Sequence, residues 1–348
     1  MKRKAQNEPT ILHVLVLPNF NLAATMAFVD PFRVANYLEG AAHFQWAFLS
    51  EAGGVVRASN GAEVKTRSLE SLGDETCDFL IVSASWEPEA HVSGPVRGFL
   101  RKAAMRQATL GGLDTGAFVL AYAGLLNGLR ATVHYEHIDA FQEVFPDVEV
   151  TETLWVFDGL RFSCSGGAAS TDVALHILRG IKGDSLANAA ARYIFAPTLR
   201  DHNASQNPEG GEPLGASVPE TVRHAIRVME EHLETPLSMV ELCREIGISH
   251  RQLNRLFAQY VQKAPALYYR DIRLDRARGL VTQTSLSMAE VAYASGFSSQ
   301  VHFSRAYKER FGLAPSRDRI EGRIPFEFRA WPMHRRLSRK VKSAANRV

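Results

Sequence analysis

The chain has 348 residues, 46% of them hydrophobic and 22% charged, with a formal net charge of +3. This length suits two domains of ordinary size, and the composition is that of a soluble globular protein rather than a fibrous or disordered one. No run approaches the roughly 20 apolar residues of a membrane span. Three cysteines without metal-ligand spacing argue against a disulfide framework, and no signal-peptide cleavage site follows the first apolar run, so we expect a cytoplasmic protein.

The net charge hides an asymmetry between the front and the back of the chain. Residues 1–216 hold 17 Lys and Arg against 24 Asp and Glu, whereas residues 217–348 hold 23 against 13. An acidic front half and a basic back half predict that only the back half meets a polyanion.

The front part alternates segments typical of strands and of helices. Turn signals at Gly53-Gly54 and Asn60-Gly61 predict a small hairpin, and Pro31 is expected to kink or restart the first helix. The predicted strands cover residues 11–17, 46–49, 79–82 and 109–113 with a late hairpin over 155–163, and the predicted helices cover residues 23–37, 96–105, 117–126, 170–180 and 185–194. This order predicts an α/β domain over residues 10–200, with a mostly parallel sheet and helices on both faces.

Residues 201–217 separate the two parts of the chain. Their sequence, DHNASQNPEGGEPLGAS, is poor in apolar side chains and rich in Gly, Pro, Asn and Ser. This composition predicts a linker between two domains.

The next segment, residues 218–319, is predicted to be an all-α domain. It opens with an amphipathic helix over residues 219–233. Ser238 with Glu241 three positions later is the pattern of a capping box, which opens a further helix. Cys243 stands where a small packed side chain is expected.

Two segments of this domain share a helix–Gly–helix outline, residues 238–259 and residues 287–311. A helix over residues 265–282 joins them. A short helix, a glycine turn and a second helix rich in Arg, Gln and His is how a helix-turn-helix presents itself to a major groove. The domain is therefore predicted to hold two helix-turn-helix units.

The second unit has the clearer pattern. Gly296-Phe297 breaks the first helix, and Phe303, Tyr307 and Phe311 then form one buried stripe at helical spacing. Gly312 is expected to cap the helix, and Pro315 is expected to prevent its resumption.

The order GF-S-S-x-x-FSR-x-YK-x-x-FG-x-x-P in this second unit resembles the signature of the AraC/XylS family of transcription regulators. The resemblance covers about residues 218–319 and implies that both second helices enter successive major grooves of double-stranded DNA. One departure is Asp318, where that family usually carries tyrosine; it lies at the C-terminal edge of the domain and hardly disturbs the resemblance.

The second helix of each unit supplies side chains suited to base edges, since Arg fits guanine and Asn or Gln fits adenine. The alternative for part of this set is a solvated helix face. The candidates for base contact are His250, Arg251, Asn254 and Arg255 in the first unit, and Ser299, Gln300, His302 and Arg305 in the second.

The tail, residues 320–348, is basic, with Arg335-Arg336, Arg339-Lys340 and Lys342. It is predicted either to be a solvated, disordered tail or to add phosphate contacts without sequence discrimination.

In the front domain, DTGAFVLAYAGLLNG over residues 114–128, followed by RATVH, resembles the elbow of the PfpI-like, class I glutamine amidotransferase-like fold. Regulators of the GlxA type join this fold to an AraC-type domain, and the resemblance covers about residues 10–195. In catalytic relatives the first elbow residue is cysteine, activated by the helix dipole and a histidine that His134 matches. Here Asp114 replaces the cysteine, and neither Cys77 nor Cys164 lies at the elbow. We therefore predict no catalytic residue, no cofactor and no metal site.

Asp114 allows two readings: a helix N-cap, or an anionic contact for a ligand. In the second reading the helix dipole is expected to keep the carboxylate ionised. Some regulators of the resembling group carry Asp here and answer to cationic or zwitterionic nitrogen metabolites. The candidate ligand-binding residues are Asp114, His134, Trp86 and Tyr135, with Asp30 and Glu136 as weaker carboxylate candidates, and the isolated aromatics have core packing as the alternative.

These features together predict a two-domain, cytoplasmic, DNA-binding transcription regulator. A small effector in the front domain is expected to shift the arrangement of two chains, so we expect a homodimer, with RNA polymerase as a further candidate partner and no membrane association. One alternative is a PfpI-like hydrolase or lyase that carries a basic module. Another is a DNA-binding protein whose front domain only dimerises.

Overall fold

The computed structural model describes residues 8–196, 200, 204, 206 and 218–321, which divide into two compact units. We call residues 8–206 the α/β unit and residues 218–321 the helical unit. Most of the predicted linker and of the predicted basic tail lies outside the described residues, so both stay predictions.

The α/β unit is built on an eight-stranded sheet with the order β3-β4-β2-β1-β5-β6-β10-β9. The six inner strands are parallel to one another, while the edge strands β3 and β9 are antiparallel to their neighbours. The strands are β1 (Thr10–Val16), β2 (Phe44–Ser50), β3 (Gly54–Arg57), β4 (Glu63–Ser68), β5 (Phe79–Ala84), β6 (Thr109–Asp114), β9 (Trp155–Asp158) and β10 (Arg161–Cys164). A separate parallel pair joins β7 (Arg130–Ala131) and β8 (Glu149–Val150).

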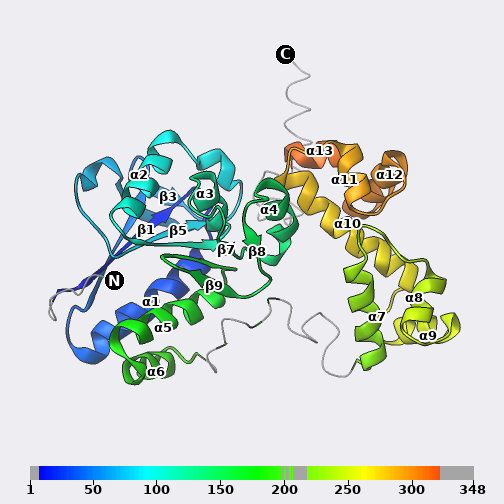
Figure 1. Cartoon of the computed structure of the whole chain (residues 1–348), viewed down its shortest axis with the longest axis horizontal. Helices are drawn as coiled ribbons and strands as arrows, with labels where there is room; N and C mark the ends of the chain where they lie inside the picture. Colours follow the sequence, from blue (N-terminus) through cyan, green and yellow to red (C-terminus); the bar gives the residue numbers. More distant parts are fainter. Residues whose placement is uncertain (1–7, 197–199, 201–203, 205, 207–217, 322–348) are drawn as a thin grey trace, which may run out of the picture. The chain divides into compact units, whose positions relative to one another are not determined.

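Helices cover both faces of this sheet (Figure 1). On β1, Val14 and Val16 belong to one hydrophobic cluster and Leu15 to the other, because successive side chains point to opposite faces. One face is covered by α1 (Leu22–Glu39), α5 (Ala169–Lys182) and α6 (Asp184–Tyr193), and the other by α2 (Gly94–Met105), α3 (Gly116–Tyr122) and α4 (Ile138–Val144). Three 3-10 turns complete the unit: η1 (Glu70–Leu72), η2 (Pro88–His91) and η3 (Tyr135–His137). The predicted α/β fold is confirmed.

Two helix predictions for this unit need correction. Pro31 lies inside one continuous helix, α1, so it does not restart the helix; the predicted kink stays a prediction. The helix after the elbow, α3, ends at Tyr122 instead of extending to Leu126, and Gly124 follows with a φ of +73°. A left-handed residue there ends the helical path.

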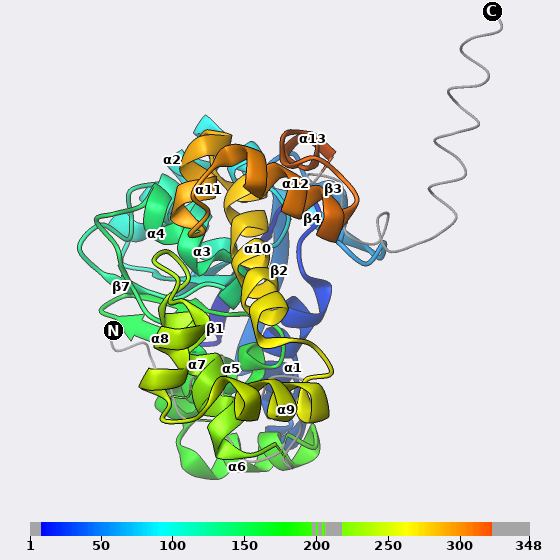
Figure 2. The ribbon, with the colours of Figure 1, turned by 90° about the vertical axis from the view of Figure 1, so that its right-hand side faces the viewer.

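The helical unit has seven helices: α7 (Glu220–Glu231), α8 (Met239–Glu245), α9 (His250–Tyr260), α10 (Pro265–Gln283), α11 (Met288–Ala294), α12 (Gln300–Phe311) and α13 (Pro315–Glu321). We call α7–α9 the first half and α11–α13 the second half. The long helix α10 belongs to both, because Tyr269 packs in the hydrophobic cluster of the first half, whereas Leu274 and Leu280 pack in that of the second. Figure 2 shows α10 running from one half to the other. The predicted all-α domain is confirmed.

In the second half, the predicted turn, helix end and buried residues agree with the structure, except at the last helix. Gly296 and Gly312 both adopt left-handed φ angles, and Phe303 and Tyr307 are fully buried. Pro315, however, begins a new helix, α13, instead of preventing one. Proline is tolerated in the first turn of a helix, where its missing N–H would have no intrahelical partner.

Asp318, the one departure from the family signature, has a structural role of its own. Its side chain is only 1% exposed. Its Oδ2 accepts a hydrogen bond from the Tyr307 hydroxyl at 2.7 Å and from Arg278 Nε at 3.0 Å. Asp318 therefore ties α13 to both α12 and α10.

Candidate functional site

The turn between β6 and α3 brings Asp114 to the carboxyl edge of the parallel sheet. Asp114 is the last residue of β6 and has a φ of +59°. The turn is tight, because a Cβ at Gly116 would lie 2.2 Å from the Val82 carbonyl oxygen. A left-handed φ at a non-glycine residue costs on the order of 1–3 kcal/mol and is found most often at functional sites. The carboxyl ends of parallel strands are also where α/β folds bind ligands.

Neutral side chains hold the Asp114 carboxyl. Its Oδ2 accepts a hydrogen bond from Asn21 Nδ2 at 2.8 Å, and the Ser85 side chain also bonds to it. Asn21 is itself fixed, since its Oδ1 caps α1 by accepting from Ala24 N–H. The N-cap position of α3 is Thr115, so the reading of Asp114 as that helix's N-cap is wrong.

Burial dominates the protonation of Asp114, which is only 5% exposed. Burial raises the pKa of its carboxyl above the ordinary value, while the hydrogen bond from Asn21 and the charge of His134 act in the opposite direction. Burial therefore acts against the ionised carboxylate that the helix terminus was expected to favour.

The other predicted ligand residues differ in their exposure and in their contacts. His134 is half-buried, and its charge and that of Glu136 both act on Asp114. The Tyr135 ring lies 4.5 Å from that of His134, and Tyr135 is 58% exposed. Trp86 is half-buried and stands two residues after the end of β5. Asp30 forms an ion pair with Arg33 on the exposed side of α1, so its carboxylate already has a cationic partner.

Neither cysteine of the α/β unit is placed to act as an elbow nucleophile. Cys164 ends β10 beside Asp114, in register with Leu113, but burial raises the pKa of its thiol to about 12. The reactive thiolate is therefore not available at neutral pH. Cys77 precedes β5 and so lies at the amino edge of the sheet.

Asn21 and Ser85 were missed by sequence reasoning. Asn21 follows β1, and Ser85 follows β5 directly. In a parallel sheet such positions share an edge, so the signal was present. The order β1-β5-β6, which makes these strands neighbours, cannot be read from the sequence.

In the helical unit, the second helix of each predicted helix-turn-helix presents a polar face to solvent. On α9, Leu253 and Phe257 are buried, and on α12, Phe303 and Tyr307 are buried. The candidates His250, Arg251 and Arg255 on α9 and Gln300, His302 and Arg305 on α12 are all exposed.

Three candidates already make side-chain contacts within the unit: Ser299, Asn254 and His250, whose Nε2 lies 3.1 Å from Asn254 Nδ2. Ser299 is the N-cap of α12, and its hydroxyl accepts from the His302 N–H at 3.2 Å. Asn254 donates to the backbone oxygen of His250 at 2.9 Å. Sequence reasoning also missed Val301, which is 69% exposed on α12 between two polar candidates. Its signal was an apolar residue outside the buried stripe.

Comparisons with known proteins cover nearly the whole chain. A family model described as a helix-turn-helix domain matches residues 242–320. The HTH-type transcriptional regulator CdhR of Pseudomonas aeruginosa is 41% identical over 88% of this chain and 90% of its own length. GbdR of the same species is 36% identical over 90% of this chain and 85% of its own length. GlxA of Rhizobium meliloti is 34% identical over 86% of this chain and 93% of its own length.

The chain belongs to the AraC/XylS family of transcriptional regulators. Within it, the chain is of the GlxA type, with a PfpI-like domain in front. A solved ThiJ/PfpI family protein from Pseudomonas syringae covers 64% of this chain and 87% of its own, with a TM-score of 0.50 and 18% identity, which concerns the fold alone. The alternative of a hydrolase or lyase with a basic module is not favoured. In the described part of this regulator, no helix has the length and apolar character needed to cross a membrane.

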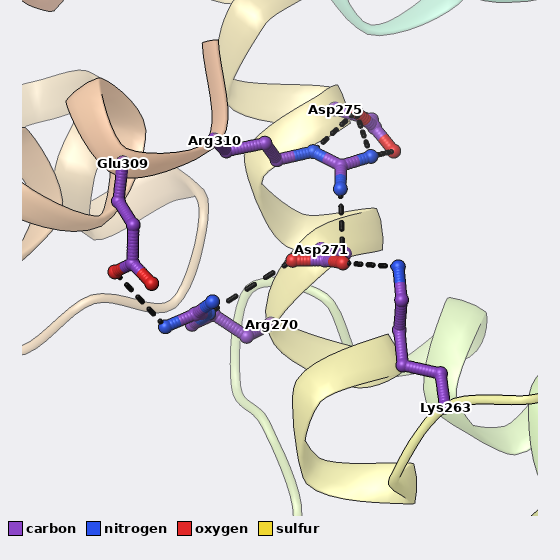
Figure 3. A network of polar contacts seen from close by, with 6 residues as sticks. All are labelled: Lys263, Arg270, Asp271, Asp275, Glu309 and Arg310. Atoms are coloured by element: carbon purple, nitrogen blue, oxygen red, sulfur yellow. Dashed lines mark hydrogen bonds and ion pairs between the residues drawn. The ribbon is translucent and has the colours of Figure 1, made fainter. Parts of the chain in front are cut away.

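In this AraC-family regulator, a network of ion pairs fixes α12 against α10 (Figure 3). Asp271 on α10 is the centre of the network, and its side chain is 13% exposed. It accepts from Lys263 Nζ at 2.6 Å and from Arg310 Nη1 at 2.9 Å. Lys263 precedes α10 and Arg310 lies on α12, so one carboxylate joins the end of the first half to α12.

Proposed function

We propose that this regulator is controlled by a small cationic or zwitterionic nitrogen metabolite bound at Asp114. The observation that carries the proposal is a buried carboxyl at a strained turn, whose hydrogen-bond donors Asn21 and Ser85 are both neutral. An ionised carboxylate away from water calls for a cationic partner. A ligand ammonium or guanidinium group would supply it.

The raised pKa of Asp114 gives this binding a pH dependence. In the free protein, burial favours the protonated carboxyl, whereas a bound cation favours the carboxylate. Cation binding therefore releases a proton wherever the carboxyl is protonated beforehand. Affinity should rise with pH until the free carboxyl is ionised. An aromatic face from Trp86 or Tyr135 would add about 0.5–2 kcal/mol by cation–π contact.

For the DNA side, the proposal is that α9 and α12 enter successive major grooves, about 34 Å apart along the DNA. The exposed faces of both helices support this reading. Arg255 and Arg305 suit guanine, Asn254 and Gln300 suit adenine, and the exposed methyl groups of Val301 suit a thymine methyl.

The regulator is further proposed to work as a homodimer in the cytoplasm, to contact RNA polymerase, and to carry out no turnover in its α/β unit. Effector binding would change the spacing of the two helical units in the dimer. Asp114 in place of a thiol, and the high pKa of Cys164, support the absence of turnover. Steady release of ammonia from glutamine, or of acid from glyoxals, that disappears in Asp114→Ala would contradict it.

Calorimetry on the full chain tests the ligand proposal. Carnitine, glycine betaine and arginine serve as probes. We expect one of them to bind the wild type, and Asp114→Asn to lose about 1.5–3 kcal/mol, roughly tenfold to a hundredfold in affinity. Asp30→Asn is the matched control, because it removes a surface carboxylate and should leave binding unchanged. Buffers with different ionisation enthalpies would reveal the released proton.

Equal affinity of the wild type and Asp114→Asn for a cation, or tight binding of a purely anionic ligand, would overturn the proposal. Ligand-independent DNA binding would instead favour the alternative in which the front domain only dimerises.

A further inference from the structure

We propose that His134, Glu136 and His137 form a binding site for a first-row divalent metal ion such as Zn²⁺. Each of these residues offers one ligand atom, two imidazole nitrogens and one carboxylate oxygen. The three atoms all lie within 4.8 Å of one another. The sequence alone had predicted no metal site.

The backbone of η3 explains how three neighbouring residues meet. His134 is the N-cap of η3, and Glu136 and His137 lie within it. A 3-10 helix has about three residues per turn, so side chains three positions apart lie one above the other. His134 and His137 have this spacing, and their ring centroids are 5.9 Å apart. Glu136, between them in the turn, adds the carboxylate.

The distances and exposures suit an ion that enters from solvent. Zn–N and Zn–O bonds are about 2.0–2.2 Å long, so two ligands of one tetrahedral ion lie about 3.4 Å apart. The three atoms lie within 4.8 Å of one another, so the site needs them to move closer by rotation of their side chains. The side chains of His134 and Glu136 are 33% and 60% exposed, and His137 is partly exposed, so neither rotation nor access requires the core to open.

The set of donors selects the kind of metal. Two imidazoles with one carboxylate suit Zn²⁺ and its neighbours Co²⁺, Ni²⁺ and Cu²⁺, whereas Mg²⁺ and Ca²⁺ prefer oxygen ligands alone. Three protein ligands leave a fourth position open, as in zinc sites that bind water or a small ligand. The alternative to a metal site is a simple ion pair at the surface, since His134 Nδ1 lies 3.9 Å from a Glu136 oxygen. An ion pair between His134 and Glu136 would not require the nearby imidazole of His137, whereas a metal site would use it as a third ligand.

The site is close to Asp114, on which the charges of His134 and Glu136 both act. Metal binding nevertheless does not depend on the effector proposal, and the test contains no effector. Failure of one proposal therefore leaves the other standing.

The test uses the full chain without a histidine tag. Zn²⁺ is titrated by calorimetry, and Co²⁺ is titrated while its visible d–d absorption is recorded. We expect one equivalent of either ion to bind, with the intense bands of four- or five-coordinate Co²⁺. Loss of one ligand in Glu136→Gln or in His137→Gln should weaken binding by at least about tenfold.

His43→Gln is the matched control. His43 lies 3.5 Å from Glu39 and so forms another His–carboxylate pair, but it stands beside the start of β2 at the amino edge of the sheet. This variant should bind both ions like the wild type. Circular dichroism checks that the variants fold. The proposal is overturned if no ion binds, if Co²⁺ shows only the weak spectrum of a six-coordinate surface ion, or if both site variants retain wild-type affinity.

Discussion

In the first and the second half of the helical unit, the same residue types begin and end the helices. Ser238 with Glu241 and Ser287 with Glu290 form complete capping boxes at the starts of α8 and α11. The turns that follow carry Gly247 and Gly296 with φ angles of +72° and +71°. Ser249 and Ser299 cap the two recognition helices.

The contacts that hold these halves to α10 are different. In the first half, Tyr269 on α10 donates to the His232 carbonyl oxygen at 2.8 Å and packs in the apolar cluster. In the second half, guanidinium groups of α10 make the contacts that hold the half to this helix. Arg273 donates to the carbonyl oxygens of Ser295 and Gly296, at 3.0 and 2.7 Å, and its guanidinium lies 4.4 Å from the centre of the Phe297 ring.

Two helix-turn-helix units with the same local sequence pattern can therefore be held to the same helix, α10, by different contacts. Short-range signals make each helix-turn-helix, whereas long-range contacts decide how firmly it is held and by which forces. The first half depends on burial, and the second adds charged contacts. The second half should therefore respond more strongly to loss of single charges and to salt, since ion pairs are screened and burial is not.

The largest expected effect is that of Asp318→Ala. The substitution leaves Arg278 and the Tyr307 hydroxyl without their shared acceptor in a buried place. Removing one partner of such a pair costs about 3 kcal/mol in the free energy of unfolding. Urea unfolding of the full chain, with hydrogen exchange to locate the change in α12 and α13, measures it.

The matched control is Glu220→Ala in the first half, where Glu220 forms an ion pair with Arg227 and its side chain is 71% exposed. An exposed pair of this kind is worth at most about 1 kcal/mol. If Asp318→Ala costs no more than this control, the comparison between the halves fails.

The second prediction compares the recognition helices through DNA. If both read bases, Arg255→Ala and Arg305→Ala should each cost about 1–3 kcal/mol at a specific site selected with the full chain. Fluorescence anisotropy on that site and on unrelated DNA measures the affinities. Unchanged affinity in either variant would mean that only the other half reads sequence at an arginine.

The smallest effect is expected for Asp271→Asn, which keeps the size of the side chain but removes the charge shared by Lys263 and Arg310. Looser positioning of α12 should cost about 1 kcal/mol on a full site, or about fivefold in affinity. Binding of a half-site should not change.

Glu309→Gln serves as the control for this change, since Glu309 is 63% exposed and lies 3.5 Å from Arg270 at the outside of the network. Equal losses on full site and half-site in Asp271→Asn would show that the network stabilises the unit without orienting its recognition helices.

The sequence by itself determined the features that depend on near neighbours. Ser238 and Glu241 are three residues apart, and the buried stripe of Phe303 and Tyr307 repeats every four, so period and spacing predicted the capping box and the second recognition helix. The motif from Gly296 to Pro315 indicated the family. The acidic character of residues 1–216 and the basic character of residues 217–348 indicated that the C-terminal domain binds DNA.

Only the tertiary structure decided the surroundings of the key carboxylates. Asn21 reaches Asp114 across 93 residues and Arg278 reaches Asp318 across 40, because strand order and helix packing bring them together. The same applies to charge: spacing suggested an ionised aspartate at a helix terminus, whereas burial raises the pKa of Asp114. Loss of water around a side chain depends on every segment that packs over it, and no local pattern contains that information.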